Sequence, residues 1–274
     1  MNGITQLFDK IEKQGQENVP ANAILKADGL LYCSSCDTPI QCKQVLLGKE
    51  YLMPCLCSCE LEKRDHTERE FKKRLKIEEI KRRRSTLLTL PKYHDMTFEK
   101  SDTTKKFTTN YVTNFEKYKT ENLGLLLWGN RGTGKTFDAA CIANALIDKG
   151  YSAFMATINH MTENLGKFEH RAEFKQHIIR FDLVIIDDFG TDRGSDYTHE
   201  LIYNIIDIRA CSCKPMIITT NLSPKEMADC EDLKSARIYD RILECCHPIA
   251  YDGASRRIET GRKRFKGIEK ELNA

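Results

Sequence analysis

The chain has no long hydrophobic run. None of its apolar stretches approaches the roughly 18 residues that a transmembrane helix requires. Its N-terminus also lacks the charged segment followed by an apolar stretch that marks a secretory signal peptide. No sign of charge dominates, because 43 Lys and Arg nearly balance 40 Asp and Glu. We therefore expect a cytoplasmic protein without a membrane partner, whose other partners cannot be inferred from its net charge.

Cysteine, in contrast, is abundant, with twelve in 274 residues. Disulfides are not expected, because the cytosol keeps thiols reduced. Six of the cysteines are scattered through apolar or loop contexts, where a free thiol acts as a small hydrophobic group. The other six fall within one short segment and need a separate explanation. They are Cys33, Cys36, Cys42, Cys55, Cys57 and Cys59.

This cysteine segment predicts a zinc ribbon. A CxxC pair is followed about twenty residues later by CxCxC, so two thiolate-bearing turns would flank a small hairpin. So short a segment could not keep a core together without such a cross-link. The alternative is a redox CxxC, but the thioredoxin-like unit in which it normally opens a helix is absent. Six thiols for four positions leave the ligand set open, and Cys42 is the first that we would exclude.

Two helices are expected outside the cysteine segment. Ile4, Leu7, Phe8 and Ile11 follow helical spacing and predict a short amphipathic helix that packs on its own domain or docks a partner. Residues 60–84 are highly charged and contain no Gly or Pro, which predicts a solvated helix. Its basic end, residues 81–84, is either a solvated linker or a contact to nucleic acid phosphates.

Residues 129–136 read G-x-x-x-x-G-K-T and directly follow an apolar run, residues 123–128. This pattern predicts a strand that enters a phosphate-binding loop, rather than a glycine turn without a ligand. In such a loop Lys135 reaches the β and γ phosphates and the Thr136 hydroxyl ligates Mg²⁺. The helix expected at 137–149 points its positive end at the same anion. The residues offered to the nucleotide are Gly129, Asn130, Arg131, Gly132, Thr133, Gly134, Lys135 and Thr136.

Beyond residue 91 short apolar runs alternate with segments of helical period. Such a pattern indicates an α/β fold, with a parallel sheet that helices cover on both faces. Ligands bind such sheets at the carboxyl ends of the strands, where the phosphate-binding loop lies. Strands are expected at residues 123–128, 153–156, 183–186 and 216–219, and helices at 103–119, 137–149, 158–165, 169–180 and 200–211.

Polar side chains end two of these strands. The strand at 183–186 runs into Asp187 and Asp188, and a buried strand has little reason to end in paired acids unless a cation lies there. Asp187 would complete the Mg²⁺ shell, and Asp188 would polarise the attacking water. The strand at 216–219 leads to Asn221, which could orient that water, although Asn-Leu-Ser-Pro is also an ordinary turn and helix cap.

Four segments occur in an order and spacing that resembles the DnaC/IstB-type branch of the AAA+ ATPases, over roughly residues 90–260. They are GLLLWGNRGTGKT, LVIIDDFG, PMIITTNLS and RIYDRILECCHPIAYDGASRR. The cysteine-rich piece is similar to that of phage and Gram-positive helicase loaders of this branch. The resemblance implies a P-loop ASCE fold and ATP as the nucleotide. It also implies an oligomer in which one subunit's arginine completes the next subunit's site.

The resemblance also implies roles for single residues. Asn221 matches the sensor 1 position, Arg241 the segment with the trans-acting arginine finger, and Arg257 the sensor 2 arginine. Their neighbours Arg237 and Arg256 are the alternatives. A guanidinium is always charged and forked, so it suits a phosphoryl group that gains charge in the transition state.

The family pattern also selects zinc ligands. Alignment on Pro54 leaves Cys55 as the spare thiol. The ligands that the resemblance implies are Cys33, Cys36, Cys57 and Cys59.

The function that we expect is ATP-dependent loading of a replicative DNA helicase onto single-stranded DNA. Residues 1–60 would bind zinc and the helicase, 61–90 would form a charged helical linker, and 91–274 would form the AAA+ ATPase. The ATPase domains would form a homo-oligomer, and the basic stretch 256–266 could contact DNA. Many AAA+ ATPases have Asp-Glu where this chain has Asp-Asp, so hydrolysis should be slow. The alternatives are an IstB-like transposition helper, a small-molecule kinase and an ATP-binding adaptor that does not hydrolyse ATP.

Overall fold

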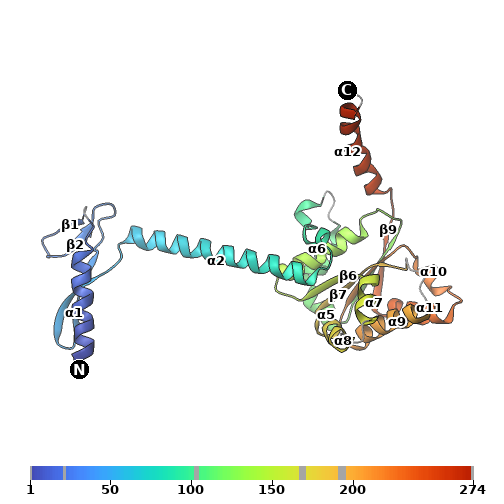
Figure 1. The fold of residues 1–274 in the computed structure, drawn as a ribbon, viewed down its shortest axis with the longest axis horizontal. Helices are drawn as coiled ribbons and strands as arrows, with labels where there is room; N and C mark the ends of the chain where they lie inside the picture. The colour runs from blue at the N-terminus through green and yellow to red at the C-terminus, as the bar shows by residue number, and fades with distance from the viewer. Residues whose placement is uncertain (1, 21–22, 102–104, 167–170, 191–195, 273–274) are drawn as a thin grey trace. The chain divides into compact units, whose positions relative to one another are not determined.

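The computed structural model describes residues 2–20, 23–101, 105–166, 171–190 and 196–272 (Figure 1). They form two compact units, residues 1–78 and residues 79–274. None of the helices in these ranges is both long and apolar enough to cross a membrane.

The N-terminal unit consists of one helix and two antiparallel hairpins. Strand β1 (Ala23–Leu25) pairs with β2 (Leu31–Cys33), and β3 (Gln41–Leu46) pairs with β4 (Lys49–Pro54). The expected amphipathic helix is present as α1 (Asn2–Glu17) and is longer than the apolar spacing indicated.

Helix α1 packs on strand β4 of its own unit. The ring of Phe8 lies 5.7 Å from that of Tyr51, measured between centroids, and Tyr51 is buried. A carboxylate oxygen of Glu12 accepts a hydrogen bond from the Leu52 backbone N–H at 2.8 Å. This face of α1 therefore packs within its own domain, which is the first of the two roles expected for the helix.

Helix α2 (Ser58–Leu87) is 30 residues long, and none of its residues is buried. Pairs such as Lys72 with Glu68, at 2.6 Å, stabilise its surface. Its last turns belong to the second unit, which begins at Glu79 rather than at the expected residue 91. Arg83 donates to the Tyr151 carbonyl at 2.8 Å, and Arg84 pairs with Asp148 at 2.7 Å. These two arginines thus hold the last turns of α2 within the second unit, and a nucleic acid role for them is not favoured.

The second unit is built on a five-stranded parallel sheet, so the α/β prediction is confirmed. The strand order is β6-β7-β8-β5-β9, and every pairing is parallel. The strands are β5 (Gly124–Gly129), β6 (Ala153–Thr157), β7 (Leu183–Phe189), β8 (Met216–Thr220) and β9 (Cys246–Tyr251).

Both faces of this sheet are covered. Leu126 contributes to a core cluster with side chains of α7, α8, α9 and α11, while Leu125 and Leu127 contribute to a second cluster with α4, α5 and α6. Because successive strand residues enter opposite cores, each strand reads as one apolar run. The α-helices are α3 (Pro91–His94), α4 (Lys106–Thr113), α5 (Phe115–Thr120), α6 (Lys135–Asp148), α7 (Ile158–Gly166), α8 (Arg171–Arg180), α9 (Asp196–Cys211), α10 (Pro224–Ala228), α11 (Leu233–Cys245) and α12 (Arg256–Leu272).

Two features differ from expectation. The single helix expected at 103–119 is two helices, because Asn114 leaves helical geometry (φ −102°, ψ 22°) between α4 and α5; residues 103 and 104 lie outside the described ranges. Strand β9 was not expected. It contains Pro248 and pairs only with β5, at an edge of the sheet, where proline is tolerated.

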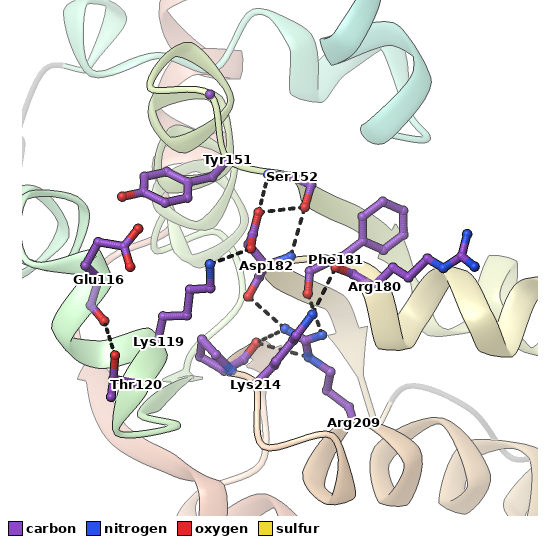
Figure 2. Close-up of polar contacts among 12 residues, drawn as sticks. Glu116, Lys119, Thr120, Tyr151, Ser152, Arg180, Phe181, Asp182, Arg209 and Lys214 are labelled. Carbon is purple, nitrogen blue, oxygen red and sulfur yellow. Dashed lines mark hydrogen bonds and ion pairs between the residues drawn. The ribbon is translucent and has the colours of Figure 1, made fainter.

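A buried arginine joins the amino-terminal ends of β7 and β8 (Figure 2). Arg209 is fully buried, and its guanidinium donates to the carbonyls of Ile178, Phe181, Asp182 and Pro215 at 2.7–3.2 Å. Burial lowers its pKa to about 10, so it stays charged at neutral pH. The carbonyls of Asp182 and Pro215 directly precede β7 and β8, whereas the phosphate-binding loop follows the carboxyl end of β5. The arginine therefore supports the edge of the sheet opposite the loop.

Candidate functional site: a nucleotide pocket and a thiol cluster

The loop between β5 and α6 has the conformation that its glycines permit. Gly132 has φ 79° and Gly134 has φ 103°, values that other residues rarely adopt. A Cβ at Gly132 would also collide with the side chain of Ser255. Thr133 closes the turn with a hydrogen bond to the Asn130 carbonyl at 2.9 Å. The loop thus needs glycine at Gly134, which the sequence pattern specifies, and also at Gly132, which the pattern leaves open.

The ammonium group of Lys135 lies at the centre of this loop. It donates to the carbonyls of Gly129 and Asn130 at 2.7 Å each and to Asn221 Oδ1 at 3.0 Å. Burial lowers the pKa of Lys135, and the charge of Asp188 opposes that shift. The structure therefore brings the loop lysine together with the asparagine at the tip of β8, as the sequence predicts.

Three hydroxyl groups surround the Asp187 carboxylate, which is fully buried. Thr136 and Thr219 donate to Oδ1 at 2.8 and 2.7 Å, and Tyr93 donates to Oδ2 at 2.8 Å. Thr136 and Asp187, the two expected Mg²⁺ ligands, are therefore neighbours. Carboxylate and hydroxyl oxygens are the hard donors that Mg²⁺ prefers, so this group fits the ion.

Asp188 lies beside Asp187 but faces outward. The pairing of β7 with β8 shifts register between Ile186 and Phe189, and Asp188 has φ 55° and is exposed. Partial burial and the charge of Asp187 raise the pKa of its carboxyl group, while nearby cations act against the rise. Those cations are Lys92, Arg257 and Lys135.

A cavity of about 940 Å³ opens beside the loop, large enough for a nucleoside triphosphate. Lysines and arginines from three parts of the unit border it: Lys92 and Lys100 before β5, Arg131 in the loop, and Arg256, Arg257 and Arg264 in α12. The Arg256 backbone N–H donates to the Gly132 carbonyl at 2.9 Å and ties the start of α12 to the loop. Both sensor 2 candidates, Arg257 and its neighbour Arg256, are therefore at the site.

Lys92 and Tyr93 were not found by sequence reasoning. They lie far upstream of the loop and match no local nucleotide-binding pattern, so only the folded chain brings them to Asp187 and Asp188. Burial raises the pKa of Tyr93, which keeps its hydroxyl protonated and able to donate.

Arg241 is not among the residues that border this cavity in the described part of the chain. It lies on α11, where its guanidinium is 3.4 Å from Asp207 and 3.0 Å from Glu244. The contact with Glu244 raises the pKa of Arg241. The alternative, Arg237, is exposed on the same helix. Neither arginine serves the nucleotide pocket of its own chain in this structure.

The N-terminal unit contains a separate cluster of four thiols. The Sγ atoms of Cys33, Cys36, Cys57 and Cys59 all lie within 4.8 Å of one another. Cys55 points to the Pro39 carbonyl at 3.4 Å instead. A hydrogen bond with Thr38 lowers the pKa of Cys36 to about 6, which favours the thiolate that a metal requires. The four thiols are the set that the sequence selected, and their number and spacing fit a tetrahedral zinc ion.

The fold and the nucleotide pocket define a P-loop protein of the α/β class. Strand β8 lies between β5, which leads into the phosphate-binding loop, and β7, which contains Asp187 and Asp188. Within that class the chain belongs to the IstB-like ATP-binding protein family, whose model matches residues 33–264. The match includes both the thiol cluster and the nucleotide pocket, and it identifies ATP as the nucleotide of the family. The resemblance seen in the sequence motifs is confirmed.

Similar proteins include helicase loaders. The replicative helicase loader DnaI of Bacillus subtilis (strain 168) is 28% identical over 204 residues, which are 66% of this chain and 66% of DnaI. The replicative helicase loader DnaC of Escherichia coli (strain K12) is 30% identical over 119 residues, which are 42% of this chain and 47% of DnaC. The chain thus matches less than two thirds of the length of either relative.

A Mycobacterium tuberculosis protein that is encoded in an insertion sequence and named as ATP-binding is 26% identical over 203 residues, 69% of this chain and 80% of that protein. Crystal structures of DnaI and of the DnaC helicase loader share the fold. Each has a TM-score of 0.53 and 23% identity, and they cover 64% and 60% of this chain.

Proposed function

We propose that the protein is an ATPase that loads a replicative DNA helicase onto single-stranded DNA. The convergence of Lys135, Asn221, Thr136 and Asp187 at the ends of β5, β7 and β8 carries the ATPase part of this proposal. The loading role is supported by the similarity to the helicase loaders DnaI and DnaC.

Each residue of the pocket has a task in hydrolysis. Lys135 exchanges the carbonyls that it now contacts for phosphate oxygens, and Asn221 and Asp188 orient the water that attacks the γ-phosphate. Thr136 and Asp187 would hold Mg²⁺, which would neutralise charge on the phosphates. Arg257 or Arg256 contacts the same phosphates from α12. The short Asp188 side chain holds its carboxylate back and keeps turnover slow.

Arg241 completes the pocket of a neighbouring subunit in a homo-oligomer. It is charged, half-exposed and outside its own pocket, as a trans-acting arginine must be. Its contacts with Asp207 and Glu244 have to open when it engages a neighbour.

The N-terminal unit binds zinc through its four clustered thiolates and binds the helicase. Arginines of α12 that are not engaged by nucleotide bind single-stranded DNA phosphates. These assignments place the helicase on the N-terminal unit, and the nucleotide and the DNA on the second unit.

A transposition helper is the second candidate, because the insertion-sequence protein matches this chain over 80% of its own length. In that role the ATPase would be the same and the partner would be a transposase.

The deciding experiment is capture of the purified replicative helicase of the host cell by the full chain. We expect a complex in the presence of ATP, and turnover that rises with single-stranded DNA. The matched control is Asp188→Asn, which should still bind ATP and the helicase but hydrolyse ATP at least about tenfold more slowly. A chain that ignores the helicase and forms a complex with a transposase would replace the first proposal with the second.

A further inference from the structure

The two oxygens of the Asp187 carboxylate have partners of different origin. Oδ1 accepts from Thr136, in the phosphate-binding loop, and from Thr219, on the neighbouring strand β8. Oδ2 accepts from Tyr93, which lies 94 residues upstream and outside every nucleotide-binding motif of the chain. One carboxylate oxygen of Asp187, an expected Mg²⁺ ligand, is therefore held by a residue that has no assigned role.

The position of Tyr93 is fixed from several sides. Its side chain is fully buried, and its carbonyl accepts a hydrogen bond from the Asn144 amide on α6 at 2.7 Å. The same amide also donates to the Met96 carbonyl at 2.8 Å. Upstream, the Thr89 backbone N–H donates to the Met155 carbonyl on β6 at 3.0 Å. Because residues 89–96 are held by both α6 and β6, the Tyr93 hydroxyl has little freedom to move away from Oδ2.

A carboxylate that accepts hydrogen bonds on both oxygens cannot rotate freely about its terminal torsion. Without the Tyr93 hydroxyl, Oδ2 would be buried and unpaired, and rotation would take Oδ1 away from Thr136. Partners that orient a metal ligand commonly change metal affinity by about 10- to 100-fold when they are removed. The hydroxyl is therefore placed to act on metal binding without touching the nucleotide.

We propose that Tyr93 is a positioning residue that holds the Asp187 carboxylate in the orientation that Mg²⁺-ATP requires. This inference rests on the proposed Mg²⁺-dependent chemistry of the pocket. It gives residues 89–96 a direct influence on the metal side of the site, while Lys135 and the loop govern the phosphate side.

The test removes only the hydroxyl. In Tyr93→Phe, ATP affinity is measured by titration with a fluorescent ATP analogue, with Mg²⁺ and with excess EDTA. We expect the Mg²⁺-dependent gain in affinity to fall by about tenfold, while the affinity in EDTA stays unchanged. The Mg²⁺ concentration for half-maximal ATP turnover should rise by a similar factor.

The matched control is Tyr111→Phe. Tyr111 is also buried and also donates its hydroxyl at 2.8 Å, but to the Leu123 carbonyl rather than to Asp187. The Tyr111→Phe variant should show the same Mg²⁺ dependence of ATP binding and ATP turnover as the unaltered chain.

Three results would overturn the inference. One is an unaltered Mg²⁺ dependence in Tyr93→Phe, and another is an equal loss of ATP affinity with and without Mg²⁺. The third is a Tyr93→Phe chain that fails to fold while Tyr111→Phe folds, because that would assign Tyr93 a purely structural role. The binding measurement needs no hydrolysis. If the unaltered chain binds Mg²⁺-ATP but does not hydrolyse it, the ATPase proposal is refuted, and the binding titrations still decide the role of Tyr93.

Discussion

The charge of the Asp188 carboxyl group depends on neighbours that shift its pKa in opposite directions. Burial and the neighbouring Asp187 raise the pKa of its carboxyl group, and Lys92, Arg257 and Lys135 act in the opposite direction. In the proposed mechanism Asp188 has to be ionised to polarise water, so the balance between these groups would set the lowest pH at which ATP turnover persists. Lys135 and Arg257 are also assigned to the phosphates, so Lys92 is the neighbour that can be changed with least effect on ATP binding.

Lys92→Gln should therefore move the acidic limb of the pH–rate profile to higher pH. Loss of a positive charge removes an interaction that lowers the pKa of Asp188, so the pKa rises further. The profile of kcat against pH measures it. Lys100→Gln is the control, since Lys100 borders the cavity but its ammonium group donates to the Asp95 carboxylate at 3.2 Å. A shift toward lower pH, or an equal shift in both variants, would contradict the assignment.

Among single residues of the pocket, those that belong to contiguous sequence patterns could be predicted, and those outside such patterns could not. The loop glycines, Lys135 and the Asp187-Asp188 pair could be read because a polyphosphate and a cation require fixed local spacing. Tyr93 and Lys92 could not, since they reach the same carboxylates only through the fold.

Among the structural elements, the strands of the sheet depend on contacts at both of their ends. At the carboxyl ends lie the groups that bind nucleotide. At the amino ends, Arg209 links the carbonyls before β7 and β8, and the Asp182 carboxylate accepts from Ser152 Oγ at 2.7 Å and pairs with Lys119 at 2.8 Å (Figure 2). The two ends can thus be altered separately.

Arg209→Met should lower the free energy of unfolding by about 3–5 kcal/mol. The methionine fills a similar volume but leaves four carbonyls without their donor, two of them in buried and two in partly buried contacts. Urea unfolding followed by circular dichroism measures the loss. Lys214→Met is the control, because Lys214 donates only to the Arg180 carbonyl, at an exposed position, and should cost less than about 1 kcal/mol. Equal stabilities of the two variants would show that the buried network contributes little.

The elements that sequence reasoning predicted well are those buried on both faces. Strands β5 to β8 are apolar over most of their length because each face meets a separate core. Strand β9 escaped notice because only its two end residues are buried and it carries Pro248 at an edge of the sheet. The break between α4 and α5 has no apolar signature, since Phe107, Tyr111 and Phe115 keep helical spacing across it.

On the scale of the whole molecule, the two units differ in how they are stabilised. The described part of residues 1–78 buries only Tyr51 and Cys57 among its hydrophobic side chains, whereas the ATPase unit has two extensive core clusters. A core of two side chains cannot offset the conformational entropy of so many residues. The proposed zinc ion should therefore provide most of the stability of the N-terminal unit.

Removal of zinc should unfold the N-terminal unit and leave the ATPase unit intact. We expect one zinc per chain by atomic absorption, and Cys36→Ser or a strong chelator should abolish metal content, helicase capture and protection of residues 1–78 from protease. ATP affinity should not change. Cys42→Ser, outside the thiol cluster, is the control and should retain all three properties. An N-terminal unit that resists protease without metal would refute the zinc assignment.

The exposed helix α2 has a consequence for how such proteins diverge. Since none of its side chains is buried, substitutions or added turns along its outer part disturb no packing. A crossover between genes within codons 61–78 would join a different N-terminal unit to the same ATPase at little cost in folding. Selection could then change the partner that the ATPase serves in one genetic step, while every residue around Asp187 is inherited unaltered.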